Sequence, residues 1–297
     1  MAWTADEFYG RDRQFLDGLD GRGEAYVVEV PVNTRVWLNK PTVRQNQAKS
    51  RVGRPKRPKY LRVQDQKNSE VQNLARHSPV FYQQNPQRYL IKETHKGQEV
   101  WEVRWSTCWR KTHQESLISS QGTLIVAKNV RTCEVKYFLS NRVPGRGGWT
   151  LRKILKVAFG RWPVEDCFRE AKEELGLDHF ECRSWHGIHR HLHVTMLSHL
   201  FCARVREKLC PSDDVSTGEL LTTEQVRRAM NVYLQAAILA PRFRIQMYQD
   251  EKERQTYYQS RNATAAASHR KKRRRLLESL GINPDSIKSV VDKPNSA

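Results

Sequence analysis

WTADEFYGRDRQFLDGLDGRGEAYVVEVPV, residues 3–32, contains the pattern that indicates the fold. Two β-rich runs, WTAD and AYVVEVPV, flank RDRQFLDGLDGRG, a helical segment that ends in glycines. A strand that carries Asp6 is therefore followed by a helix and a second strand, which predicts an α/β opening. Further along, EVWEVRWSTCWRK, GTLIVAKNV and EVKYFLSNR are rich in β-branched and aromatic residues, so the middle third is expected to form an antiparallel sheet.

The sequence changes character after PGRGG and predicts a helical C-terminal half. Thr150 is a suitable N-cap for one helix, and Pro163 and Gly176 bracket a second helix, in which Phe168, Ala171 and Leu175 form an apolar stripe. A third helix is expected over about 189–209, and a fourth over about 222–239. The third helix is expected to turn four residues inward, namely Leu192, Met196, Leu200 and Ala203. Beyond residue 242 the chain is polar and basic, and we expect it to be loosely held.

Positive charge dominates the composition. The 297 residues include 52 Lys+Arg and 32 Asp+Glu, a formal net charge of +20. Two acid-free blocks, 35–64 with ten Lys+Arg and 261–275 with seven, account for 17 of these charges. Such a balance indicates a polyanionic partner, and nucleic acid is the first choice. Each block could also be a solvated tail or loop.

Several classes of protein are excluded or disfavoured by the composition. No stretch approaches the roughly 18 apolar residues of a membrane span, and MAWTADEFYG lacks the features of a signal peptide. The six cysteines are scattered without a CxxC pair, as expected for reduced thiols. We therefore expect a soluble cytoplasmic protein, associated with the nucleoid when it is bound to DNA.

Residues 161–201, RWPVEDCFREAKEELGLDHFECRSWHGIHRHLHVTMLSHLF, contain the most specific motif. This segment resembles the region of insertion-sequence DDE transposases that carries the catalytic glutamate, in the group marked by a Tyr-x2-Arg-x3-Glu-x6-Lys signature. Arg161, Glu165 and Lys172 have the signature spacing, whereas Ala158 occupies the place of the tyrosine. The resemblance extends to WTADEFYGRDRQFLDGL, in which Asp6 corresponds to the second catalytic aspartate.

The resemblance implies an RNase H-like catalytic core of α/β class that is interrupted by a β-rich insertion domain and followed by a helical C-terminal half. It implies Mg²⁺-dependent cleavage and joining of DNA at transposon ends and target sites, by paired subunits that form a homodimer in a synaptic complex. The expected organisation has part of the core over 1–34, the insertion with a basic loop over 35–148, the helical end of the core over 149–210, a C-terminal helix over 211–245 and a basic tail over 246–297.

The resemblance assigns roles to individual residues. Asp6 and Glu165 would be catalytic and would bind the two metal ions, since Mg²⁺ prefers carboxylate oxygens. Arg161 and Lys172 would contact phosphate or orient the carboxylates. Four residues of the first basic block are further candidates for DNA binding, namely Arg54, Lys56, Arg57 and Lys59.

Simpler readings stand beside these roles. Arg161, Glu165 and Arg169 at four-residue spacing could form ordinary surface ion pairs on a helix. Six histidines between 179 and 199 invite a zinc site, but stacking, hydrogen bonding or contact with DNA fits their spacing better. Trp101, Trp105 and Trp109 would share one side of a strand, as core or as a surface for stacking bases.

One feature departs from the family pattern. DDE enzymes take their first aspartate from an earlier strand, and only five residues precede Asp6. The sequence is therefore expected to be an N-terminally truncated transposase, with an incomplete metal site and no activity alone. The alternative is a non-catalytic DNA-binding remnant that competes with the intact enzyme, and a third reading is an unrelated basic RNA-binding protein.

Overall fold

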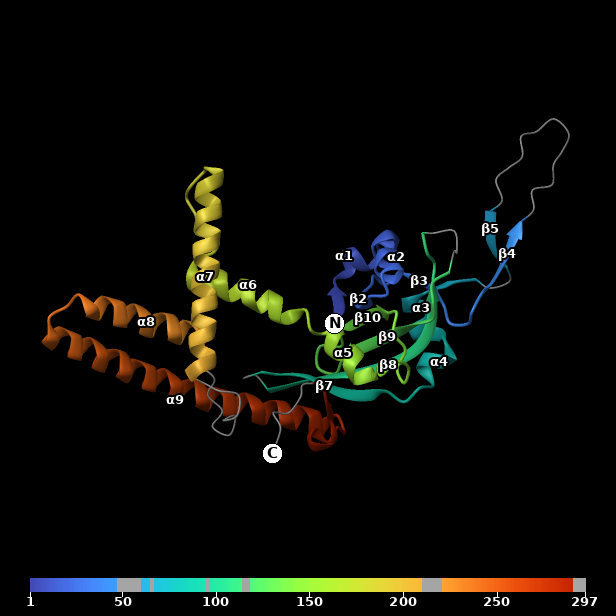
Figure 1. Cartoon of the computed structure of the whole chain (residues 1–297). Coiled ribbons are helices and arrows are strands. Elements are labelled where there is room, and N and C mark those ends of the chain that lie inside the picture. The colour runs from blue at the N-terminus through green and yellow to red at the C-terminus, as the bar shows by residue number, and fades with distance from the viewer. Residues whose placement is uncertain (47–59, 65–66, 95–96, 114–117, 210–220, 291–297) are drawn as a thin grey trace. The chain divides into compact units, whose positions relative to one another are not determined.

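The computed structural model describes residues 1–46, 60–64, 67–94, 97–113, 118–209 and 221–290. The chain forms two compact units (Figure 1). The first comprises 1–94, 98–161 and 283–291, and the second comprises 162–282 together with 95–97 and 292–297. Arg54, Lys56, Arg57 and Lys59 lie outside the described residues.

The first unit is built on a mixed β-sheet. Its main path runs β1-β2-β10-β9-β8-β3-β6, while β7 pairs with β8 and with β11. The strands of this sheet are β1 (Ala2–Ala5), β2 (Ala25–Glu29), β3 (Arg35–Trp37), β6 (Ser69–Glu70), β7 (Gln87–Thr94), β8 (Gly97–Arg110), β9 (Gly122–Asn129), β10 (Val135–Ser140) and β11 (Lys288–Ser289). A separate antiparallel pair is formed by β4 (Thr42–Asn46) and β5 (Tyr60–Gln64).

The register confirms the pattern that the sequence predicted. β1 and β2 are parallel and are joined through α1 (Glu7–Gly10) and α2 (Arg13–Gly21), which is the expected strand-helix-strand opening. β8, β9 and β10 form an antiparallel meander, and β10 pairs antiparallel with β2. The protein therefore has a mixed α/β fold in which the predicted strand-rich middle extends the sheet begun by β1 and β2.

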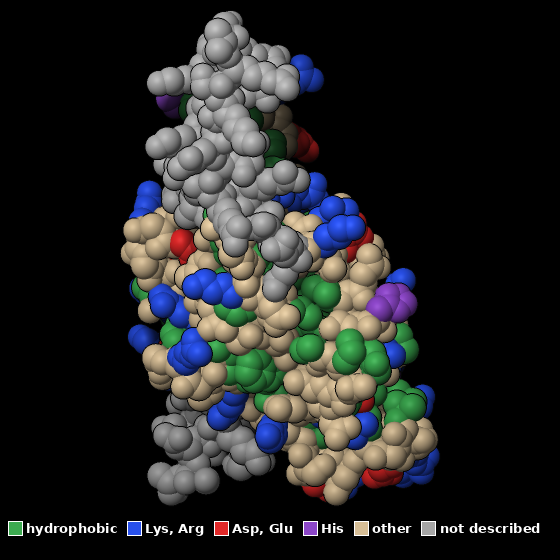
Figure 2. Space-filling model, turned by 90° about the vertical axis from the view of Figure 1, so that its right-hand side faces the viewer, with side chains coloured by type: hydrophobic (Ala, Val, Ile, Leu, Met, Phe, Trp, Pro, Cys, Tyr) green, Lys and Arg blue, Asp and Glu red, His purple; other side chains and the backbone are tan. Residues whose placement is uncertain are grey.

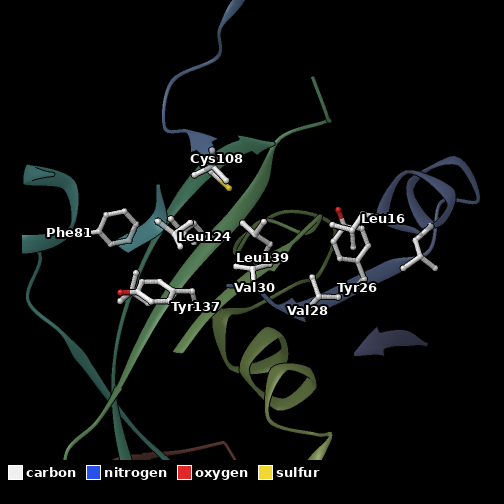
Figure 3. Packing of buried hydrophobic residues seen from close by; sticks show 13 residues of the cluster. Leu16, Tyr26, Val28, Val30, Phe81, Cys108, Leu124, Tyr137 and Leu139 are labelled. Atoms are coloured by element: carbon white, nitrogen blue, oxygen red, sulfur yellow. The ribbon is translucent and has the colours of Figure 1, made fainter. Parts of the chain in front are cut away.

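The sheet buries side chains on both faces because successive residues of a strand point to opposite sides. On one face the core contains Val28, Leu124 and Leu139, covered by Leu16 of α2 and Phe81 of α4 (Pro79–Tyr82) (Figure 3). The short helix α3 (Val71–His77) contributes further packing to this cluster. The helix α2 is therefore fixed to the sheet close to the end of β1.

The opposite face is closed by α5 (Leu151–Ala158) and the residue that follows it. Thr150 caps this helix as predicted, since its hydroxyl accepts a hydrogen bond from the backbone N–H of Lys153. The Phe159 ring centroid lies 5.1 Å from that of Trp101, which is fully buried. Trp101 is therefore a core residue, and Trp105 and Trp109 are half-buried.

A buried polar group ties α2 to β8. Arg110 pairs with Asp17 and Asp20 at 2.6 Å each, and its Nε donates to the Tyr26 hydroxyl at 3.1 Å. Burial raises the pKa of Tyr26, and the charge of Arg110 offsets part of that rise. Burial likewise raises the pKa of the nearby Cys108 thiol to about 12, so this cysteine is uncharged near neutral pH.

The second unit is helical. Its helices are α6 (Trp162–Leu175), α7 (Trp185–Leu209), α8 (Thr223–Ala237) and α9 (Pro241–Ser279). Gly176 has a φ of +68°, as expected for the residue after a helix end. Thr222, where the fourth helix was predicted to begin, is the N-cap of α8 and forms a full capping box. None of the helices in the described part of the chain is long and apolar enough to cross a membrane.

Two expectations for the helical half are corrected. α7 turns Thr195 and Cys202 inward, whereas Met196 and Leu200 are exposed. Polar and apolar residues are mixed around this helix, so periodicity does not single out one face. Residues 242–279, expected to belong to a loosely held tail, form most of the 39-residue helix α9. Pro241 at its first turn and alanines at 263 and 265–267 favour that helix.

Candidate active site

Asp6 stands directly after β1, where the chain turns into α1. Its Oδ1 accepts hydrogen bonds from the backbone N–H groups of Phe8 and Tyr9, at 3.1 and 3.3 Å, so Asp6 is the N-cap of α1. The Asp6 side chain is 41% exposed, and its Oδ2 lies 3.8 Å from Arg161 Nη1. One carboxylate oxygen is therefore fixed by the helix, while the other faces a cation at the surface.

The position of Asp6 depends on close packing between α1 and β2. Gly10, the last residue of α1, is buried, and a Cβ atom there would overlap the carbonyl oxygen of Glu29. Only glycine allows the backbone of α1 to approach the strand so closely. A lateral shift of α1 would therefore move the capped aspartate as well.

The structure brings together two of the predicted site residues, Arg161 and Asp6. They are 155 positions apart in the sequence, and both belong to the first unit. Arg161 precedes α6, and its side chain is 34% exposed. The sequence suggested a phosphate-binding or carboxylate-orienting role, and the ion pair with Asp6 is compatible with the second of these.

Glu165 and Lys172 lie on α6, in the second unit. Both are exposed and share one side of the helix, since residues seven apart are separated by about two turns. Phe168 lies on the same side and is 47% exposed, so the expected apolar stripe of Phe168, Ala171 and Leu175 is wrong at its first member. Arg169 pairs with Asp166 and Glu173, at 3.0 and 3.2 Å, rather than with the Glu165 of the simple ion-pair reading.

The inward side of α6 has a polar network that the sequence did not indicate. Glu170 accepts a hydrogen bond from the Thr223 hydroxyl at 2.6 Å and lies within 4.0 Å of Arg206 and His199. Glu174 pairs with Arg227 of α8 at 3.3 Å. These contacts hold α6 against α7 and α8 and leave the side with Glu165 facing outward. The sequence spacing of Glu165, Phe168 and Lys172 could not show which side of α6 faces outward, because the residues that pair with Glu170 and Glu174 come from helices distant in sequence.

The histidine-rich segment is used for local packing. His191 Nε2 lies 2.9 Å from the Gly176 carbonyl oxygen, and the His189 ring packs on Trp185 with ring centroids 3.9 Å apart and planes inclined at 51°. His199 Nδ1 lies 3.8 Å from Cys167 Sγ. These are the stacking and hydrogen-bonding roles that the spacing favoured.

The carboxylates of the candidate site are of the ligand type that divalent metal ions prefer. Asp6 Oδ2 and the exposed carboxylate of Glu165 are hard oxygen donors, which suit Mg²⁺. Within the described ranges, however, no three His, Cys, Asp or Glu side chains are grouped so that they could hold a metal ion. Asp6 and Glu165 are therefore candidate ligands, and no complete metal site is formed by the described residues.

Basic side chains are widespread at the surface. Figure 2 shows one face of the chain, on which Lys and Arg side chains are spread widely and Asp and Glu side chains are fewer. This distribution agrees with the formal net charge of +20. A surface of this kind attracts polyanions over distances of about 8–10 Å at ordinary ionic strength.

Asp6 lies at the carboxyl end of a strand of a parallel pair, the end at which α/β sheets commonly bind their ligands. Residues 2–98 match the family model of the DDE superfamily endonucleases. This match includes β1, Asp6, α1, α2 and β2, and it confirms the resemblance to DDE enzymes over that part of the chain. A search of curated proteins found no match.

The family match supports a transposase-like function with DNA as the substrate. DDE nucleases generally use divalent metal ions, in agreement with the oxygen donors of Asp6 and Glu165. The matched range ends before α6, so the match does not include Glu165.

Proposed function

We propose that the chain is a transposase, or part of one, that hydrolyses phosphodiester bonds at transposon ends and transfers the freed strand to target DNA. The observation that carries this proposal is the position of Asp6, directly after the first strand of a parallel β-pair within the segment matched to DDE endonucleases. In this proposal the first unit is an RNase H-like core with a β-rich insertion, and Glu165 is the family's catalytic glutamate.

Each site residue has a separate task in this proposal. Asp6 and Glu165 would hold Mg²⁺, which would supply charge stabilisation for the attacking and leaving oxygens of a phosphoryl transfer. Arg161 holds the Oδ2 atom of Asp6 at the surface and contacts a DNA phosphate when the carboxylate binds metal. Lys172 contacts phosphate from the side of α6 that carries Glu165.

Two carboxylates are fewer than a two-metal site ordinarily requires, so we propose that a further aspartate completes it. The chain by itself is then inactive or nearly so, and cleavage takes place when that aspartate is supplied. Paired subunits would hold the two transposon ends together. Arg54, Lys56, Arg57 and Lys59 would contact DNA outside the metal site.

The second candidate function is that of a non-catalytic DNA-binding protein that occupies transposon ends and competes with an intact enzyme. The observation that favours it is the absence, within the described ranges, of a group of three potential metal ligands. Binding of this kind depends on the basic side chains alone. Charge does not separate the two functions, because both require it.

The test measures nicking of DNA that carries the transposon ends. The purified chain is incubated with Mg²⁺, alone and together with an N-terminal segment of a related DDE transposase that carries the further aspartate. We expect salt-sensitive binding without nicking by the chain alone, and nicking by the mixture that is lost in Glu165→Gln and in Asp6→Asn. Nicking by the chain alone would contradict the incomplete site. Binding without nicking in every mixture would support the competitor.

A further inference from the structure

The second basic block forms part of an exposed helix. Residues 254–277 contain eight Lys+Arg and no acid, and all of them lie within α9 (Figure 1). Arg261, Arg270, Lys271, Lys272 and Arg275 are all exposed. The sequence left open that this block is a solvated tail. Its backbone is helical, however, so the charged residues are held at regular intervals along the helix.

The block extends beyond the helix that packs on α9. α8 and α9 form a helical hairpin in the second unit, joined by a short turn after Ala237 (Figure 1). At about 1.5 Å per residue, the 15 residues of α8 span about 22 Å and the 39 residues of α9 about 58 Å. α8 can therefore cover only the first part of α9, and the basic block lies beyond its reach.

One side of this helix combines positive charge with small polar groups. Successive residues turn by about 100°, so a set with spacings of three and four shares one side. That set, called here the basic face of α9, comprises Arg261, Thr264, Ser268, Lys271, Lys272 and Arg275. All six residues are exposed, and alanines at 263, 265 and 267 beside them keep the helix narrow.

We propose that the basic face of α9 binds double-stranded DNA, with the helix lying in the major groove. An α-helix with its side chains is about 10–12 Å across, and the major groove of B-DNA is about 12 Å wide. The Lys and Arg side chains contact phosphates on either side, while Thr264 and Ser268 face the base edges. The face is about 21 Å long over its 14 residue steps, enough to cross a groove.

The chemistry of the helix favours duplex DNA over other polyanions. The block from 261 to 275 has no apolar stripe that could enter a lipid surface, since its uncharged positions are Ala, Ser, Thr, Asn and His. A-form RNA has a deep, narrow major groove that side chains cannot read. Like charges at Arg270 and Arg274, and at Lys271 and Arg275, repel along the free helix and are neutralised by phosphates on binding.

This inference rests on the proposed action on DNA, but its test involves no cleavage and no metal. Binding of the full chain to a duplex is measured over a series of salt concentrations. The variant Lys271→Gln/Lys272→Gln/Arg275→Gln is compared with Arg13→Gln/Arg22→Gln/Arg131→Gln, which removes three exposed charges from the first unit. We expect the first variant to lower the salt slope by about three and affinity by about 100-fold. The control should stay within about threefold of wild type.

A second pair of variants tests insertion into the groove without a change of charge. Ser268→Trp places a bulky ring on the basic face, and Ala263→Trp places one on an exposed position about 140° around the helix. We expect at least a tenfold loss of duplex binding for Ser268→Trp, near-normal binding for Ala263→Trp, and at least tenfold weaker binding of duplex RNA.

Equal losses in either pair of variants, or equal binding of duplex RNA, would overturn the inference. The proposed function would stand in that case if nicking were still observed. Conversely, failure of the nicking assay would leave a DNA-binding α9 intact, so the two failures can be told apart.

Discussion

Asp6 has two roles that can be separated at the residue scale. Its Oδ1 caps α1, and its Oδ2 is the oxygen available to a metal ion. Asparagine and aspartate are about equally good N-caps, whereas alanine at that position costs about 1 kcal/mol. A cap and a metal ligand therefore respond differently to the same pair of substitutions.

We predict that Asp6→Ala lowers the free energy of unfolding by about 1 kcal/mol and that Asp6→Asn changes it by only a few tenths of a kcal/mol. Urea denaturation followed by circular dichroism measures both values. Asp6→Asn should nevertheless abolish metal-dependent cleavage in the complemented nicking assay. Equal destabilisation by the two variants would show that the cap contributes nothing beyond the carboxylate charge.

Arg110 gives a second prediction at this scale. Its side chain is 7% exposed and pairs with the buried Asp17 and the half-buried Asp20, so its removal leaves both carboxylates without their cation. Arg110→Met should lower the free energy of unfolding by about 3–5 kcal/mol. Arg88→Met, which breaks the more exposed pair with Glu102, should cost less than about 1 kcal/mol. Denaturant unfolding that finds similar losses for both would contradict this account of the core.

At the scale of elements, α1 is placed by the close contact of Gly10 with β2. Gly10→Ala forces the helix away from the Glu29 carbonyl and should cost about 1–3 kcal/mol, the usual range for overpacking. Gly18, within α2, has open space where a Cβ atom would project, so Gly18→Ala should stabilise by up to about 1 kcal/mol. Thermal unfolding compares the two, and stabilisation by Gly10→Ala would contradict the proposed close approach.

Helix caps and strand-forming runs, which depend on neighbouring residues alone, predicted the helices and strands well. Thr150 caps α5 as expected, α8 begins next to the predicted position 222, and the β-rich run that contains Trp109 lies in β8. The spacing of apolar residues did not predict the buried sides of α6 and α7, on which Phe168 and Leu200 are exposed. The inward sides of these helices are held partly by polar contacts such as that of Glu170 with Thr223, and hydrophobic spacing cannot reveal such contacts.

At the scale of the whole molecule, the opening αβ unit and the nuclease resemblance were predictable, because a strand, a helix and a second strand are adjacent in sequence. The approach of Arg161 to Asp6 follows from the fold rather than from spacing, since 155 positions separate them. The 39-residue length of α9 was not predicted either, because its charged residues give no apolar face. The candidate site was thus found by motif, and its geometry required the structure.

We propose above all that Asp6 and Glu165 are ligands in the same divalent metal site when DNA is bound. This proposal is tested most directly in the complex of DNA, the chain and the N-terminal segment that supplies the further aspartate. Mg²⁺ is replaced with Fe²⁺, and peptide cleavage by locally generated hydroxyl radicals is mapped. We predict cuts in the chain beside both residue 6 and residue 165, suppressed by excess Mg²⁺. Both cuts should be lost together in Asp6→Asn and in Glu165→Gln. Cleavage at only one of the two positions, or cuts that persist in both variants, would contradict the claim.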